Sequence, residues 1–241
     1  MIAFGGFALT AAAAAPHKVV RNSAALDFSY EWPAEAVAIP ALDLKLYTDA
    51  KAKLAQAQKS AAEDQALTRR QKRDFNQHDF SASWETKGET PRLLSLQGNF
   101  GGFEGGAHPN SYFQALLWDR QTGGEIRVES LFERPNDFAA LTRPAYCRKL
   151  QVERAKRREG ESADGLAATD PFNACPKYSE LAISPVDKDK DGRFDTIDFV
   201  ASAYVAGPYV EGDYEIFVPV TAKIVAALKP GFRSSFEAQP Q

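Results

Sequence analysis

Alternation of apolar and polar residues marks several stretches in the first half of the chain. In 25–32, Leu26, Phe28, Tyr30 and Trp32 alternate with polar side chains. This period of two places the apolar side chains on one face and predicts a half-buried strand. Further strands are predicted at 78–85, at 92–103 and at 111–119, the last of which is apolar on both faces.

A different period follows the first strand. In 39–67, Leu42, Leu46 and Leu54 recur at multiples of four, with alanines between them, and Pro40 suits a first helical turn. This spacing predicts one long amphipathic helix. The basic run at 69–73 is typical of a solvated helix end, where positive charge complements the helix dipole.

The second half of the chain contains shorter elements. Residues 137–158 are polar and helical in character, with an interruption predicted at Pro144. Strands are predicted at 179–186, 193–205 and 213–219, and a last helix from Pro219 to Pro230. This order predicts an α+β fold with largely antiparallel sheets, one long N-terminal helix and a C-terminal helix. We expect two packed subdomains, 24–105 and 106–230.

Composition and charge narrow the functional classes. The 241 residues include 44% hydrophobic and 25% charged residues, enough apolar material for a sizeable core. The formal net charge of −3 gives no electrostatic attraction for nucleic acid.

The first residues, 1–15, are uncharged and end in an alanine run, which indicates a signal peptide and a periplasmic or secreted protein. An apolar first strand or helix is the alternative. No stretch is long enough to suggest a membrane span.

The chain has two cysteines, Cys147 and Cys175, which flank a polar insertion. If the protein is exported, an oxidising compartment favours a disulfide between them. Two unrelated buried thiols are the alternative. The cysteine and histidine spacings do not indicate a zinc site.

Residues 101–110, GGFEGGAHPN, form a glycine-rich stretch that also contains His108 and Pro109. The glycine spacing differs from a dinucleotide fingerprint, and a strand rather than a helix follows. Positive backbone φ angles at the glycines explain the stretch as a turn. A contact of Gly105, Gly106 and His108 with a ligand is the functional alternative. An envelope hydrolase that uses His108 with Glu104 is a rival hypothesis, but the sequence assigns no catalytic residue.

Residues 187–198, DKDKDGRFDTID, match the spacing of a calcium-binding loop, with Gly192 at position six. The candidate calcium ligands are Asp187, Asp189, Asp191, Asp195 and Asp198. Strands rather than helices flank the loop, and Asp-Gly between strands also favours a hairpin. Calcium is the one cofactor that the sequence suggests, and a hairpin without calcium is the preferred prediction.

Three segments together are similar to a known family. They are GGAHPNSYFQALLWDRQTGGEI, SLF and FVASAYVAGPYVEGDYEIFVPV. The chain resembles, over about 24–230, the RsiV/PdaC-like extracytoplasmic domain family, which is of poorly known function and includes a lysozyme receptor. The resemblance implies a two-part α+β unit and export. Tyr209, in the third segment, is a further candidate ligand-binding residue.

These observations together predict a non-catalytic binding domain of the cell envelope. The resemblance suggests a protein such as lysozyme, or cell-wall glycan, as its ligand. The rivals are the envelope hydrolase and a calcium-stabilised structural module.

Overall fold

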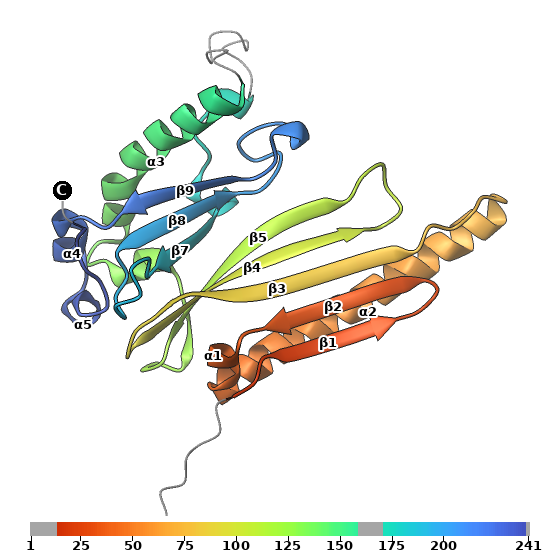
Figure 1. The fold of residues 1–241 in the computed structure, drawn as a ribbon, viewed down its shortest axis with the longest axis horizontal. Coiled ribbons are helices and arrows are strands. Elements are labelled where there is room, and N and C mark those ends of the chain that lie inside the picture. Colours follow the sequence, from red (N-terminus) through yellow and green to blue (C-terminus); the bar gives the residue numbers. More distant parts are fainter. Residues whose placement is uncertain (1–13, 159–170, 240–241) are drawn as a thin grey trace, which may run out of the picture.

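The first six strands form one sheet in the order in which they occur along the chain. The computed structural model describes residues 14–158 and 171–239. The strands are β1 (His17–Asn22), β2 (Leu26–Trp32), β3 (His78–Glu89), β4 (Leu93–Phe103), β5 (Asn110–Asp119) and β6 (Gly124–Ile126). All neighbouring pairs are antiparallel except β2–β3. That pair is parallel because a helix carries the chain back across the sheet between the two strands (Figure 1).

This crossover contains α1 (Ala34–Val37) and α2 (Pro40–Arg70). Helix α2 covers one face of the sheet and packs on β1, β2 and β3. Leu42 and Leu46 on α2 are buried against the apolar face of β2, where all four alternating side chains are at most 2% exposed. The predicted strand and long helix are therefore confirmed.

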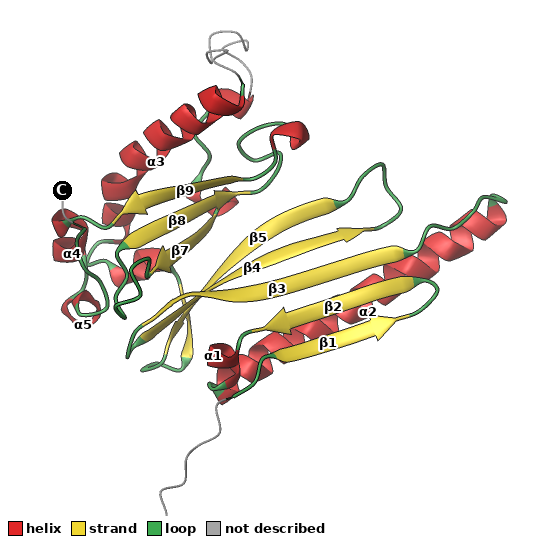
Figure 2. Cartoon of the chain, in the orientation of Figure 1, coloured by secondary structure: helices red, strands yellow, loops and turns green. Residues whose placement is uncertain are grey.

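A smaller antiparallel sheet follows in the second half of the chain (Figure 2). It consists of β7 (Ala182–Val186), β8 (Thr196–Ala201) and β9 (Tyr214–Pro219). Strand β7 lies nearest the six-stranded sheet, and α3 (Pro135–Arg157) packs beside β9. Two short helices, α4 (Ala222–Ala227) and α5 (Pro230–Arg233), end the fold. The α+β class and the largely antiparallel sheets are confirmed.

Two predicted elements differ from the structure. Helix α3 continues through Pro144, because the buried side chains Phe138, Tyr146 and Leu150 pack on the core along its whole length. The predicted C-terminal helix is two helices, and Thr221 caps the first of them by accepting a hydrogen bond from the Ile224 backbone.

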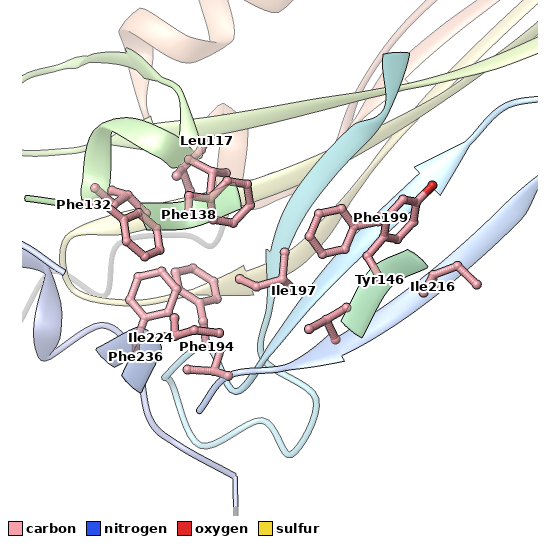
Figure 3. Packing of buried hydrophobic residues seen from close by; sticks show 14 of the residues in the cluster. Leu117, Phe132, Phe138, Tyr146, Phe194, Ile197, Phe199, Ile216, Ile224 and Phe236 are labelled. Atoms are coloured by element: carbon pink, nitrogen blue, oxygen red, sulfur yellow. The ribbon is translucent and has the colours of Figure 1, made fainter. Parts of the chain in front are cut away.

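Two hydrophobic clusters share the strands β4 and β5. Leu94 and Trp118 face the α2 side, whereas their neighbours Leu93 and Leu117 face the second cluster, which includes the aromatic residues of Figure 3. Neighbouring side chains of a strand point to opposite faces of the sheet. Both faces are therefore covered where β4 begins and β5 ends. The predicted boundary at residues 105 and 106 falls in the β4–β5 loop, so the six-stranded sheet includes both sides of it.

The two cysteines form a disulfide between α3 and the segment before β7, as predicted. Arg143 reinforces this junction by donating to the backbone oxygens of Cys175 and Pro176. Residues 159–170 of the predicted insertion, and residues 1–13 of the predicted signal peptide, lie outside the described residues. Within the described ranges, no helix combines the length and the apolar character that crossing a membrane requires.

Candidate functional site

The β4–β5 loop places His108 against two tyrosines of the β8–β9 loop. The His108 and Tyr209 rings are stacked with centroids 4.2 Å apart and an angle of 28° between their planes. Tyr204 lies beside both rings, with its centroid 6.3 Å from that of His108 and 5.7 Å from that of Tyr209. The structure thus brings together the two predicted ligand-binding residues His108 and Tyr209, which are far apart in the sequence.

Hydrogen bonds fix the orientation of these rings. Nδ1 of His108 lies 2.8 Å from the Pro109 carbonyl oxygen, which can only accept, so Nδ1 carries the proton. Nε2 then accepts from the Tyr204 hydroxyl at 3.3 Å, and the Tyr209 hydroxyl donates to the same Pro109 oxygen at 3.2 Å. The polar edges of all three rings are therefore occupied within the protein.

The three side chains remain partly exposed, although stacking covers one face each of His108 and Tyr209. Tyr204 is 53% exposed, Tyr209 is 39% exposed and the adjacent Val210 is 90% exposed. We call the surface formed by His108, Tyr204, Tyr209 and Val210 the aromatic patch. Aromatic side chains with satisfied polar edges and open faces are typical of contact surfaces, because they bury large apolar areas with little loss of conformational freedom.

Local backbone geometry shapes the β8–β9 loop. Tyr204 has a φ of +70°, which is uncommon for a residue with a side chain. A Cβ atom at Gly207 would lie 2.1 Å from Oε2 of Glu211, so a side chain there would displace the Glu211 carboxylate. Asp213 accepts a hydrogen bond from the Ala203 backbone at 2.8 Å across the base of the loop.

The end of α3 holds the same loop from outside. Arg158 contacts the Glu211 carboxylate at 2.7 Å and 3.0 Å, and Arg157 donates to the backbone oxygens of Glu211 and Asp213. Burial alone would raise the pKa of Glu211, but hydrogen bonds from Arg158 and Tyr214 hold that pKa below its usual range. The buried Arg154 donates to the Ala206 carbonyl oxygen at 2.8 Å. The loop is therefore pre-organised by charge-assisted hydrogen bonds.

The two predicted glycines shape the β4–β5 loop and do not contact the rings. Gly105 has a φ of +82°, and a Cβ atom there would lie 2.9 Å from Asp64 and 3.4 Å from the buried His78. Gly106 is exposed, and a Cβ atom there would have no neighbour closer than 4.0 Å. The glycine-rich stretch is thus a turn that presents His108.

Glu104, the acid of the hydrolase hypothesis, lies on the α2 side of the loop. It accepts a hydrogen bond from Ser60 at 3.5 Å and lines a pocket of about 190 Å³ together with Lys53 and Tyr112. The hydrogen bonds of His108 go instead to Pro109 and Tyr204. Within the described part of the chain, these contacts do not pair Glu104 with His108 as an acid and base.

The aspartate loop joins β7 to β8, and the predicted hairpin is confirmed by their antiparallel pairing. One carboxylate oxygen from each of Asp187, Asp189 and Asp191 lies within 4.8 Å of the others. Gly192 has a φ of +90°, and its backbone donates to Asp187 at 2.9 Å. The first three candidate calcium ligands are therefore grouped in the structure.

The other two candidates, Asp195 and Asp198, lie elsewhere. Asp195 is 5% exposed and accepts from the Lys188 backbone. Asp198 is fully buried in β8 and pairs with Lys87 of β3 at 3.2 Å. Burial raises the pKa of Asp198 to about 7, against the lowering effect of Lys87. Sequence reasoning missed Lys87, because a lysine in an alternating strand normally faces solvent.

Comparisons with known proteins agree with this fold. Residues 19–111 match the family model described as deacetylase PdaC. A DUF3298 family protein from Pseudomonas aeruginosa PAO1 is 13% identical, with a TM-score of 0.53, and the alignment covers 94% of this chain and 98% of that one. A DUF3298 member from Bacteroides fragilis NCTC 9343 is 12% identical, with a TM-score of 0.52, covering 92% and 97%.

No curated protein is significantly similar to the chain. At the identities given above, the solved structures establish the fold. The PdaC match over 19–111 and the DUF3298 fold over most of the chain together confirm the predicted resemblance to the RsiV/PdaC-like domain family, whose function is poorly known.

Proposed function

We propose that this protein is a non-catalytic binding domain of the cell envelope, in the periplasm or outside the cell, and that the aromatic patch is its binding surface. The observation that carries the proposal is the His108–Tyr209 stack, which two separate loops assemble at 4.2 Å. Three charged anchors at the end of α3 hold one of these loops. A surface so restrained needs little ordering when a ligand binds, which favours affinity.

The form of the patch suggests its ligand class. Two tyrosine faces and the 90% exposed Val210 offer an apolar contact area, and tyrosine is enriched among residues that dominate binding energy. Such a surface can accept an apolar side chain of a protein such as lysozyme, or the flat face of a sugar ring in cell-wall glycan. The disulfide supports an oxidising, extracytoplasmic compartment.

Binding to immobilised lysozyme and to insoluble peptidoglycan tests this proposal. We expect the purified protein to bind one of them, and Tyr204→Ala/Tyr209→Ala to weaken that binding by about 30-fold or more, the effect of losing a dominant contact. Tyr47→Ala is the matched control, because Tyr47 is 48% exposed but lies on α2. Binding to neither ligand, or equal binding by the double variant, would contradict the proposal.

A further inference from the structure

The two halves of the aromatic patch come from different sheets. His108 follows β4 of the six-stranded sheet, whereas Tyr204 and Tyr209 follow β8 of the three-stranded sheet. The stack can form only when the two sheets hold a particular spacing. The contacts between the sheets therefore bear directly on the geometry of the patch.

A buried ion pair connects the six-stranded sheet to the three-stranded sheet. Asp198 of β8 is fully buried, and its Oδ2 lies 3.2 Å from Nζ of Lys87 on β3. The same oxygen accepts a hydrogen bond from Gln97 of β4 at 3.1 Å. Two neighbouring strands of one sheet thus bind a single carboxylate of the other. We call Lys87 and Asp198 the inter-sheet pair.

Lys87 and Asp198 differ in the number of charged groups around them. Lys87 is also 3.3 Å from Glu85 and 3.5 Å from Glu215, both of which are substantially exposed. Asp198 faces Gln97 and, in register on β7, the buried Ser184. Lys87 is the one charged group among the described residues that pairs with Asp198, and Oδ1 of Asp198 has no hydrogen-bond partner there.

Strand β8 connects this pair to the patch. Ser202 lies four positions after Asp198, about 13 Å of extended chain. Oγ of Ser202 accepts a hydrogen bond from the backbone of Phe113 on β5 at 3.0 Å. Tyr204 follows two residues later. A displacement of β8 at Asp198 therefore moves the Tyr204 and Tyr209 side of the patch relative to His108.

We propose that the inter-sheet pair is a positioning device for the aromatic patch. The Lys87–Asp198 contact and the Gln97 hydrogen bond hold β8 against β3 and β4, and thereby set the distance between the His108 ring and the two tyrosines. The consequence for ligand affinity rests on the proposed function, but the geometric effect does not. Lys87 and Asp198 act through the loops and do not contact the ligand.

Nuclear magnetic resonance of His108 tests this proposal without a ligand. The chain has three histidines, so the His108 ring signals can be assigned with His108→Gln. In the native protein the Tyr209 ring current should shift these signals from their free values. We expect Asp198→Asn to move them part of the way back. Lys87→Met should move them further, because it removes the charged group that pairs with the buried Asp198.

The matched control is Arg92→Met. Arg92, in the turn before β4, pairs at 2.9 Å with the buried Asp119 of β5 and donates to the Gly231 backbone oxygen of α5, so none of its polar partners lies in the three-stranded sheet. This variant should lower the melting temperature and leave the His108 signals in place.

The proposal is overturned if the His108 signals stay native in folded Lys87→Met and Asp198→Asn. It is also overturned if Arg92→Met moves these signals equally. If Lys87→Met does not fold, Asp198→Asn decides alone. Failure of lysozyme and peptidoglycan binding would contradict the proposed function without affecting this result.

Discussion

In the β4–β5 loop, the residues that shape the turn differ from the residue that contributes to the aromatic patch. Gly105 occupies a left-handed conformation and packs near Asp64, whereas the adjacent Gly106 is open to solvent. His108 carries the only ring that this loop contributes to the patch. The glycines therefore belong to the turn, and the histidine belongs to the surface.

This difference predicts unequal effects of two neighbouring alanine substitutions. Gly105→Ala should reduce the free energy of unfolding by about 1–2 kcal/mol, because a side chain is strained at a φ of +82°. Gly106→Ala should change it by less than about 0.5 kcal/mol, as is usual at open surface positions. Urea denaturation of both variants measures the difference. Equal losses would show that the turn does not depend on the conformation of Gly105.

The aspartate loop also depends on individual side chains. Three carboxylates are grouped, but calcium needs six to eight oxygen ligands, and Asp195 and Asp198 are not part of the group, since Asp195 accepts from the Lys188 backbone and Asp198 pairs with Lys87. Arg193 also competes, since its guanidinium lies 3.1 Å from Asp191. These contacts favour weak binding.

We therefore expect millimolar calcium to raise the melting temperature by less than about 3 °C relative to EDTA. A site filled at a hundred times its Kd would add about 2.7 kcal/mol, or roughly 5–10 °C for a chain of this size. Thermal melts of the native protein and of Asp191→Ala, with magnesium as the control ion, make the comparison. A large rise that the substitution abolishes would establish a calcium site.

At the scale of elements, hydrophobic periodicity predicted the helices and strands that bury one face. The alternation in 25–32 and the leucine spacing in 39–67 each reflect one buried face, and both elements formed as predicted. The parallel pairing of β2 with β3 depends on where α2 returns the chain. The sequence pattern of a single segment does not predict this return. Strand β1 was not predicted as a separate element, because five of its six residues are exposed and it has little apolar pattern.

The candidate site was predictable only in part for the same reason. His108 and Tyr209 were singled out, but their stacking depends on contacts between distant segments. Lys87 lies beside a register shift between Thr86 and Gly88 in β3, a local irregularity that interrupts the regular pairing with β4. Its partnership with Asp198 could not be inferred from the spacing of an aspartate loop.

The burial of Asp198 in β8 predicts a specific pH dependence. Its pKa is raised from 3.8 to about 7, mainly by burial, so the folded protein holds this proton more tightly than the unfolded chain. The resulting stabilisation is complete below about pH 4 and is lost as the pH rises to about 7. At 1.36 kcal/mol per pKa unit, the loss is about 4 kcal/mol.

Asp198→Asn should remove this dependence. The difference in unfolding free energy between the native protein and the variant, measured from pH 4 to pH 8, reports Asp198 in the presence of Glu215, whose charge also raises the pKa of Asp198. We expect the difference to change by about 4 kcal/mol in favour of the native protein at low pH. A difference that is independent of pH would mean that Asp198 ionises normally in the folded state.

At the scale of the whole molecule, a hydrophobic cluster with residues from both sheets joins them, and a disulfide further restrains the second half of the chain. The disulfide links α3 to the segment before β7, and Arg154 of the same helix donates to the backbone of Ala174 and Ala206. The helix therefore holds both the disulfide-linked segment and the loop that carries Tyr204 and Tyr209. Covalent and polar restraints converge on the side of the molecule that forms the patch.

Loss of the disulfide should consequently affect stability more than fold. The bond joins cysteines 28 positions apart, and closing a loop of that length stabilises by about 3.6 kcal/mol in the chain-entropy model. Cys147→Ser/Cys175→Ser, or reduction of the native protein, should lower the melting temperature by roughly 7–14 °C. The contacts of Arg143 and Arg154 remain available and should preserve the native far-ultraviolet circular dichroism.

Without reductant, a thiol reagent should label neither cysteine in the native protein. Two readily labelled thiols in exported protein, or an unchanged melting temperature after reduction, would show that the core alone supports this side of the molecule.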